Sequence, residues 1–451
     1  MSVKNIQERL QKGEVTSVEL VEQSLRNHEQ WIDKNSIAVI SPYAMMQAIE
    51  RDRERALGKI RGPLHGIPIL IKDNILYKDG TPTTANAFAL HDFIPPHHAT
   101  LVENLIASGA IILGKANLSE FAYFMSYDDM PSGFGSMYGQ VKHPFDEKID
   151  PLGSSTGSAV AVKLGIVDLA IGSETNGSLM APAYQCQIVS VKPSFGYVSK
   201  HGIIPISPTQ DCAGPMAQTV EDCAYLLDAI AKEDEHDQDT SQLPRPKSFT
   251  DRLYEPLEPQ KIGFLSIKGH TYAESELHLL SVAEKRLISL GHQVIHLEIE
   301  QAHIPNDPTL LIEFKHALNH FLEQFKGSTK MTSLHDIIEF NKANERRCLR
   351  YGQSILTASE QTCGELKDPS YISMRRELVE KASLLEKLMK EHDLISIAAP
   401  LWLGFAPIYG NPSVCIPEGV FEGVPKAMVF IGKKYDDASL IRLTHQYQQL
   451  E

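Results

Sequence analysis

Paired cysteines are absent from this sequence. Its six cysteines are widely spaced and include no CxxC pair: Cys186, Cys212, Cys223, Cys348, Cys363 and Cys415. Neither a zinc site nor a disulfide framework is indicated, because both need cysteines at characteristic short spacings. We therefore expect free, mostly buried thiols in a reducing cytoplasm, and no bound metal.

Long apolar runs and an excess of positive charge are absent too. No run approaches the roughly 18 apolar residues that span a bilayer, and the N-terminal residues carry scattered charges instead of the apolar segment of a signal peptide. Lys and Arg total 43 against 57 Asp and Glu, giving a formal net charge of -14. Because no surplus cations are available for phosphate backbones or anionic lipids, we expect a cytoplasmic protein with no nucleic-acid or membrane partner.

What remains is the composition of a globular protein with alternating helices and strands. Hydrophobic residues make up 42% of the 451 residues and charged residues 22%, which allows a sizeable core. Helical spacing begins the chain at 6–25, and GIPILIKDNI (66–75) has the short apolar character of a buried strand. Residues 99–121 predict a helix, a stop at Gly109 and a strand at 110–113. This alternation predicts an α/β architecture.

The second half continues the alternation around a helical segment. A polar connection is expected at 235–259, followed by strands at 261–267 and 292–299 that flank a helix. Charged helical patterns at 305–393 predict a helical insertion packed beside the sheet. Apolar runs near the C-terminus then return to strand.

The stretch GSSTGSAVAVKLGIVDLAIGSETNGS (153–178) is rich in small residues and hydroxyls. We expect a turn at each end, with a helix at 158–164 and a strand at 168–171 between them. A phosphate-binding loop does not fit, because GxxxxGK[ST] is absent and Lys163 comes too late. Residues 153–157 match the G-x-S-x-G of a nucleophile elbow centred on Ser155. That motif needs a preceding strand, whereas 142–152 is rich in proline and charge.

A lysine offers another way to activate a serine here. Lys72 ends the apolar run Ile67–Ile71, and burial there would lower the lysine pKa and make the neutral amine available as a base. The alternative is a half-solvated lysine at a strand end, paired with Asp73. Spacing alone leaves both interpretations open.

Several long motifs resemble those of the amidase signature family. They are GIPILIKDNI, LGSSTGSAVAV, SETNGS and VKPSFGYVSKHGIIPISPTQDCAGPMAQTVEDC, with a closing match in APIYGNPSVCIPEGVFEGVPKAMVFIGKKYDDASLI. The resemblance covers about 5–235 well and is weak between about 240 and 390. It implies an α/β/α sandwich around a large mixed sheet, forming a single domain over 1–451 with a signature core at about 60–235.

The same resemblance implies a Ser-Ser-Lys triad. The lysine falls on Lys72, the bridging serine on Ser154, which follows a cis peptide bond in relatives, and the nucleophile on Ser178. Backbone N–H groups of the turn before the nucleophile would form the oxyanion hole, at Thr175, Asn176 and Gly177. The other hydroxyls, Ser155, Thr156, Ser158 and Ser173, are expected to make turn hydrogen bonds or helix caps.

Some positions depart from the common family pattern. Thr156 and Asn176 replace glycines, as in the branch that resembles peptide amidases, and Leu152 replaces another. Asn176 is expected to keep a left-handed backbone. Met180 stands where glutamine-using relatives have an arginine, which disfavours a substrate carboxylate. Met125, Ser126 and Met180 are expected in the substrate pocket, although core packing is the more frequent explanation for the aromatic and methionine residues at 121–125.

The function implied is hydrolysis of a carboxamide through a serine acyl-enzyme, without metal or organic cofactor. The expected partner is a small-molecule or peptide amide, and a homo-oligomer is possible. Two alternatives stand beside it. One is the transamidating subunit of a tRNA-dependent amidotransferase, and the other is a catalytically silent binding scaffold.

Overall fold

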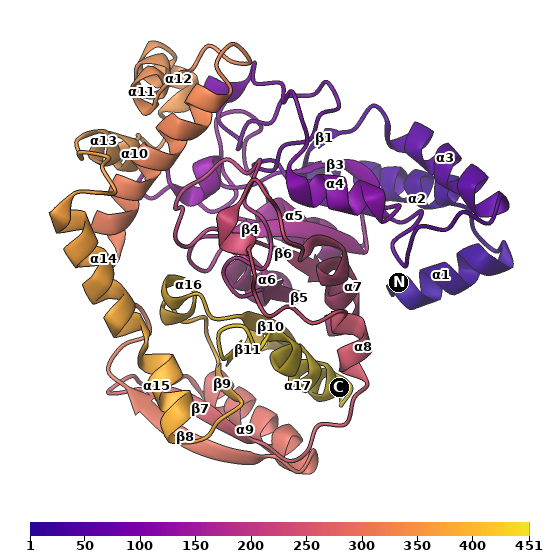
Figure 1. The fold of residues 1–451 in the computed structure, drawn as a ribbon, viewed down its shortest axis with the longest axis vertical. Helices are drawn as coiled ribbons and strands as arrows, with labels where there is room; N and C mark the ends of the chain where they lie inside the picture. The colour runs from indigo at the N-terminus through magenta and orange to yellow at the C-terminus, as the bar shows by residue number, and fades with distance from the viewer. Residues whose placement is uncertain (451) are drawn as a thin grey trace.

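The computed structural model describes residues 1–450, and its centre is an eleven-stranded mixed sheet (Figure 1). The strands lie in the order β1-β3-β2-β4-β6-β5-β10-β11-β9-β7-β8. Parallel pairing joins β2 to β3 and β4, and β7 to β8 and β9, whereas the other neighbours are antiparallel. The strands are β1 (Ile37–Ile40), β2 (Pro68–Lys72), β3 (Ile111–Ala116), β4 (Leu169–Glu174), β5 (Val189–Lys192), β6 (Cys212–Ala217), β7 (Lys261–Ile267), β8 (Gln293–Ile299), β9 (Ser396–Ala399), β10 (Ser413–Phe421) and β11 (Val424–Gly432).

Helices cover both faces of this sheet, as expected of an α/β/α sandwich (Figure 1). The helices of the first half are α1 (Val3–Lys12), α2 (Ser17–Gln30), α3 (Ala44–Ala56), α4 (Thr100–Ala107), α5 (Thr156–Lys163), α6 (Met180–Cys186) and α7 (Val220–Ile230). Those of the second half are α8 (Phe249–Leu253), α9 (Glu274–Ser289), α10 (Asp307–Gln324), α11 (Leu334–Ala343), α12 (Glu345–Cys348), α13 (Ser354–Glu360), α14 (Pro369–Ala382), α15 (Leu384–Glu391), α16 (Phe405–Tyr409) and α17 (Asp437–Gln448).

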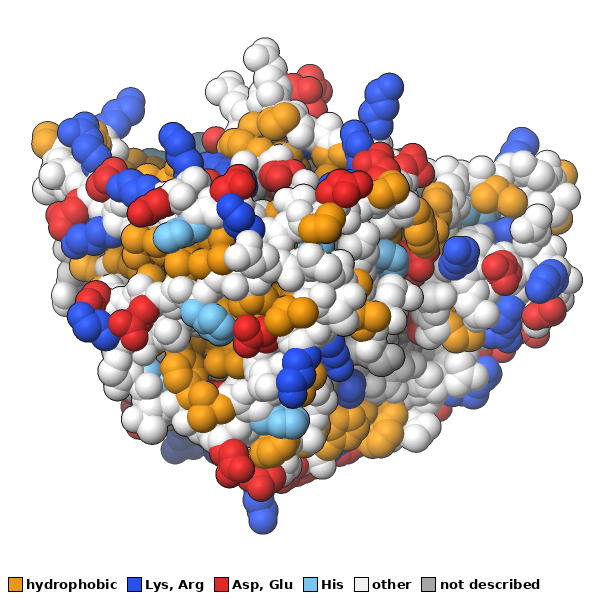
Figure 2. All heavy atoms as spheres, turned by 90° about the horizontal axis from the view of Figure 1, so that it is seen from below, with side chains coloured by type: hydrophobic (Ala, Val, Ile, Leu, Met, Phe, Trp, Pro, Cys, Tyr) orange, Lys and Arg blue, Asp and Glu red, His pale blue; other side chains and the backbone are white. Residues whose placement is uncertain are grey.

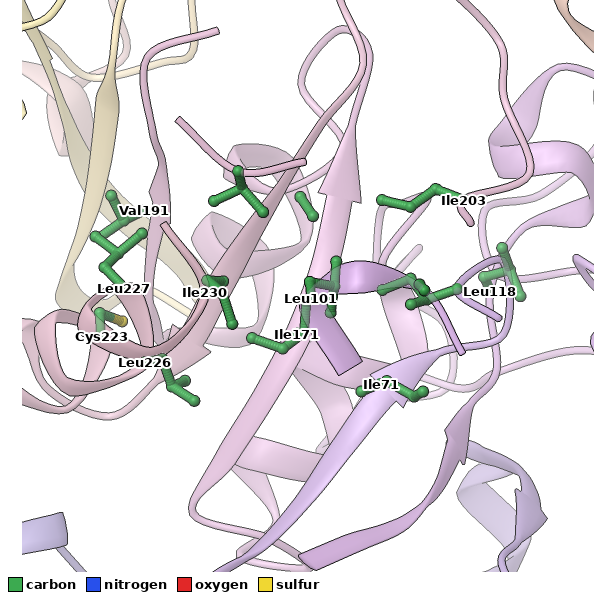
Figure 3. Close-up of a cluster of buried hydrophobic side chains, with 14 of the residues drawn as sticks. Ile71, Leu101, Leu118, Ile171, Val191, Ile203, Cys223, Leu226, Leu227 and Ile230 are labelled. Carbon is green, nitrogen blue, oxygen red and sulfur yellow. The ribbon is translucent and has the colours of Figure 1, made fainter. Parts of the chain in front are cut away.

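Alternation along the central strands produces two cores. In β2, Ile69 and Ile71 belong to the cluster on one face and Leu70 to the cluster on the other. Successive side chains of a strand point to opposite faces, so a strand buried on both faces is apolar throughout. Figure 3 shows part of the first cluster, where Ile171 of β4 lies between Ile71 of the neighbouring strand β2 and Leu226 of α7.

The strands expected at 66–75, 110–113, 168–171, 261–267 and 292–299 are confirmed, and their ends differ from the expectation by a few residues. The composition of 122–152 predicts a loop, and apart from Ala122 and Tyr123, which end the 3-10 helix Glu120–Tyr123, these residues form no helix or strand. The polar connection at 235–259 differs from expectation. It includes α8, whose Phe249 and Leu253 are buried in the core. Their apolar side chains are separated by polar residues, so the local composition concealed the short helix.

The helical segment α10–α15 runs along one flank of the molecule, between β8 and β9 in the sequence (Figure 1). It packs against the first half of the chain through aromatic rings, with Phe314 of α10 lying 5.0 Å from Phe124 between ring centroids. This packing brings residues far along the sequence to the loop at 122–152.

None of the described helices combines the length and apolar character required to cross a membrane. Figure 2 shows one face of the molecule, on which acidic and basic side chains are interspersed with hydrophobic ones. That face therefore presents no continuous field of one sign.

Candidate active site

A fully buried lysine lies at the end of β2. Lys72 is its last residue, and Ser173 is the penultimate residue of the parallel neighbour β4, so both reach the same edge of the sheet. The Lys72 amine donates to Ser154 Oγ at 2.8 Å, to Ser173 Oγ at 3.0 Å and to the Ser173 carbonyl at 3.1 Å. Burial lowers the pKa of Lys72 to about 7, although the carboxylates of Asp211 and Glu174 oppose this shift.

The alternative of a half-solvated lysine paired with Asp73 is wrong. Lys72 has no exposed surface, and the Asp73 carboxylate instead accepts from the backbone N–H and the hydroxyl of Thr84, at 3.1 and 2.7 Å. Burial raises the pKa of Asp73 to about 6. The position of Lys72 in β2 explains its burial. Because protein covers both faces of this strand, the side chain of its last residue is buried whichever face it points to.

Ser154 follows a cis peptide bond from Gly153, as the family resemblance implies. Ser155, the centre of the G-x-S-x-G match, is occupied structurally: its hydroxyl donates to the Ser173 carbonyl at 2.9 Å and accepts from the Ser173 N–H at 3.1 Å. The hydroxyls of Thr156 and Ser158 donate to backbone carbonyls at 2.9 and 3.2 Å, in agreement with the expected turn bonds. Ser173 was not expected to contact the lysine.

Ser178 lies in the turn between β4 and α6, on the wall of the main cavity. The Ser155 N–H donates to the Ser178 carbonyl at 3.2 Å, which joins the two turns of the stretch 153–178. No hydrogen bond connects the hydroxyls of Ser154 and Ser178 within residues 1–450. The structure therefore brings Lys72 and Ser154 into direct contact and joins Ser178 by its backbone to Ser155, the neighbour of Ser154.

The turn 175–178 presents unused donors. In the part of the chain that the structure describes, the backbone N–H groups of Thr175, Asn176, Gly177 and Ser178 donate to no protein acceptor. Thr175, Asn176 and Ser178 line the cavity. The expectation for Asn176 is wrong in one respect: the left-handed residue is Gly177, at φ 82°. A Cβ at Gly177 would lie 2.8 Å from Trp402 Nε1, so glycine is required both by the backbone and by the indole.

Two buried acids hold this turn, and no sequence motif indicates this role for either. Glu174 accepts from the N–H groups of Leu179 and Met180 at 2.8 and 3.2 Å, on the far side of Ser178. Asp211 accepts from the Thr175 hydroxyl at 2.5 Å, and burial raises its pKa to about 6. Their positions within motifs were visible in the sequence, but their hydrogen-bond partners were not.

The cavity beside Ser178 has a volume of about 420 Å³. Ser126 lies on its wall as expected, whereas Met125 and Met180 do not and are packed in the hydrophobic clusters. No Lys, Arg or His is among its described lining residues, which are Ala122, Tyr123, Phe124, Ser126, Tyr127, Asp129, Met130, Gly153, Thr175, Asn176, Ser178, Ile206, Asn306, Asp307, Leu310 and Ile355. The wall combines aromatic and aliphatic side chains with hydroxyl and amide groups and two carboxylates.

Metal ligands are not gathered at this or any other described site. Within residues 1–450, no group of three or more His, Cys, Asp or Glu side chains is arranged to hold a metal ion. Five of the six cysteines are buried and Cys363 is exposed, all as free thiols.

Comparison with known proteins agrees with the motifs. A family model described as Amidase matches residues 19–401. The chain belongs to the amidase signature family. It is 33% identical over 442 residues to a probable amidase of Arabidopsis thaliana, an alignment that covers 92% of this chain and 83% of the relative.

Solved structures of this family resemble the whole chain. The peptide amidase from Stenotrophomonas maltophilia has a TM-score of 0.93 and 35% identity, with 100% of this chain and 96% of that chain covered. A glutamyl-tRNA(Gln) amidotransferase subunit of Natranaerobius thermophilus is 29% identical over 489 residues, covering 100% of this chain and 95% of the relative. This amidase-family protein is therefore a hydrolase of amide C–N bonds, and the alternative of a silent scaffold is set aside.

Proposed function

We propose that the protein hydrolyses a carboxamide through a Ser-Ser-Lys triad in which Ser178 is the nucleophile. The observation that carries this proposal is the buried Lys72 amine, whose pKa is lowered to about 7, in hydrogen-bond contact with Ser154 at the base of the Ser178 turn. A lysine with that pKa is substantially neutral near pH 7 and has a lone pair available as a base.

The proton moves in two steps. Neutral Lys72 accepts the proton of the Ser154 hydroxyl, and Ser154 accepts that of Ser178 as Ser178 Oγ attacks the amide carbonyl carbon. The second transfer requires Ser178 Oγ to come within hydrogen-bond distance of Ser154 Oγ, by a change of the Ser178 rotamer about its Cα–Cβ bond. Catalytic hydrogen bonds commonly tighten only when substrate is bound.

The tetrahedral intermediate carries its negative charge on the former carbonyl oxygen. The unpaired N–H groups at 175–178 supply donors for that charge at the cavity wall. When the intermediate collapses, Ser154 passes its proton to the leaving nitrogen and takes one back from Lys72, so the amine or ammonia departs and Lys72 is neutral again. Water then attacks the acyl-Ser178 ester and gives its proton to Ser154 as Ser154 passes one to Lys72. Collapse of this second intermediate returns a proton through Ser154 to Ser178 Oγ and releases the carboxylate.

A neutral acyl group suits the cavity better than an acidic one. Its wall combines Tyr123, Phe124, Leu310 and Ile355 with two carboxylates and holds no cation. We propose peptide amides or aryl and alkyl amides as the substrate class. The similarity in fold and sequence to the Stenotrophomonas maltophilia peptide amidase supports this choice.

The decisive experiment combines turnover and covalent labelling. Ser178→Ala should abolish hydrolysis of an amide panel and labelling by a fluorophosphonate probe. Ser158→Ala, which removes another buried hydroxyl from the same stretch, should retain both. Labelling of the Ser178→Ala protein at wild-type rate would overturn the assignment of the nucleophile.

A second candidate function is the transamidating subunit of a tRNA-dependent amidotransferase. The observation that favours it is the full-length similarity to such subunits. That function requires hydrolysis of glutamine, whose α-carboxylate has no cation to meet in this cavity. Release of ammonia from free glutamine faster than from peptide amides would favour this candidate over the first.

A further inference from the structure

A buried carboxylate on the helical segment reaches toward the Ser178 turn. Glu313 lies on α10 and has no exposed surface. Its oxygens accept from the hydroxyl of Ser207, from Thr209 at 3.1 and 3.2 Å, and from Tyr371 at 2.6 Å. Arg375 lies 4.0 Å away on α14. Burying a carboxylate is costly unless donors surround it, and here two donors come from the loop 206–211 and one from α14.

The same loop holds the turn that presents the unpaired N–H groups. Asp211, at the end of the loop, accepts from the Thr175 hydroxyl at 2.5 Å, and Gln210 donates to the Thr175 carbonyl at 3.1 Å. The Ser207 hydroxyl accepts from the Gln210 N–H at 3.1 Å while donating to Glu313. A continuous series of hydrogen bonds thus connects Glu313 to Thr175.

The arrangement also fixes the turn relative to the substrate wall. Ile206 precedes Ser207, and Leu310 lies one turn before Glu313 on α10, and both line the cavity. Movement of the loop away from α10 would therefore displace a cavity wall and the Thr175 contacts together. Oxyanion donors act only when they are aimed at the developing charge, so a small displacement affects turnover more than substrate binding.

We propose that Glu313 is a positioning residue: by holding the loop 206–211 through Ser207 and Thr209, it orients the N–H groups at 175–178 toward the substrate carbonyl. This inference rests on the proposed function. It assigns to the helical segment a part in transition-state stabilisation, beyond covering the site.

The test compares two variants, each of which removes one hydroxyl donor to the Glu313 carboxylate. Ser207→Ala cuts the connection to the loop, whereas Tyr371→Phe removes a donor from α14 and leaves the loop contacts in place. We expect Ser207→Ala to lower kcat roughly tenfold with KM within about twofold, and Tyr371→Phe to change kcat by less than about twofold. Glu313→Gln should show the same loss of kcat as Ser207→Ala. If the Glu313→Gln protein does not fold, the comparison of Ser207→Ala with Tyr371→Phe still tests the inference.

A binding measurement separates positioning from general destabilisation. The affinity of Ser207→Ala for a peptide aldehyde, which forms a tetrahedral adduct, should fall by the same factor as kcat/KM, while affinity for the carboxylate product stays unchanged. Equal losses of kcat in Ser207→Ala and Tyr371→Phe would overturn the inference. So would a Ser207→Ala protein in which only KM or only the melting temperature changes while kcat does not. Activity in Ser178→Ala would instead overturn the proposed function, so the two failures are distinguishable.

Discussion

The backbone N–H of Ser155 donates to the carbonyl of Ser178 at 3.2 Å, across a sequence separation that contains all of α5 and β4. This contact joins the ends of one small-residue stretch beside the amine of Lys72. The proposed Ser-Ser-Lys chemistry depends on that proximity, because Ser154 adjoins one partner of the contact and Ser178 is the other.

The pH dependence of activity should report the buried amine. In the proposed mechanism the neutral form of Lys72 is the base. Because the pKa of Lys72 is lowered to about 7, kcat/KM for a neutral amide should rise with pH through about 7 and then level off. Initial rates between pH 5.5 and 9 check this. Lys72→Arg, which stays charged, should lack activity throughout; a wild-type rate that is flat across pH 7 would contradict the role given to Lys72.

The stability of the fold should depend on the same group with a defined sign. The folded pKa of Lys72 is about 7 and its ordinary value is 10.5, so between these limits the unfolded chain binds the proton that the folded chain lacks. Stability from this residue therefore increases with pH in that window, by about 1.4 kcal/mol per pH unit. Urea unfolding of the wild type and of Lys72→Met at pH 7.5, 8.5 and 9.5 tests this expectation. The difference between the two proteins in how the unfolding free energy changes with pH gives the contribution of Lys72. Parallel slopes for the two proteins would refute the lowered pKa.

Gly177→Ala should damage the site beyond its effect on backbone strain. The added Cβ would meet the indole of Trp402, and a displaced turn would misdirect its N–H groups, so we expect kcat to fall by about 100-fold or more. Gly165→Ala is the matched control, because Gly165 also has a positive φ but faces open space. The control should lose about 1 kcal/mol of stability and keep its kcat. Similar kcat values in both variants would show that Trp402 does not constrain the turn.

Substrate charge should matter in one direction. Asp129 and Asp307 line the cavity without any cation beside them on its wall, so an acyl group carrying a carboxylate should react more slowly than its neutral isostere. One like charge at about 4 Å in water costs about 1 kcal/mol, which corresponds to about fivefold in kcat/KM. Paired peptide amides ending in glutamate and glutamine measure the ratio. Asp307→Asn should reduce it, and a preference for the glutamate peptide would show that substrates do not approach these carboxylates.

Sequence patterns could predict those features of the candidate site that depend on neighbouring residues in the chain. The burial of Lys72 follows from the uninterrupted apolar residues before it, and the turns around Ser154 and Ser178 follow from their glycines. The left-handed residue was assigned to Asn176 because asparagine tolerates that backbone, but the adjacent glycine adopts it at lower cost.

Contacts between distant segments were beyond reach of such patterns. Nothing near Glu313 in the sequence indicates that it meets Ser207, which lies 106 positions earlier. Met125 and Met180 were expected in the pocket because the family resemblance places substrate-binding residues at these positions, yet both side chains pack in the hydrophobic cores and do not line the cavity. The helical segment itself was predicted from its periodicity, but its contact with the loop at 122–152 depends on tertiary packing.

The flank built by α10–α15 has a consequence for how such an enzyme diversifies. The proposed triad lies within 72–178, whereas Leu310 and Ile355, which also line the cavity, come from a separate stretch of the sequence. Substitutions there can change which amides are accepted while the bond-breaking apparatus is inherited unaltered. Glu313 would be the exception, a position where a change in substrate range also disturbs the chemistry.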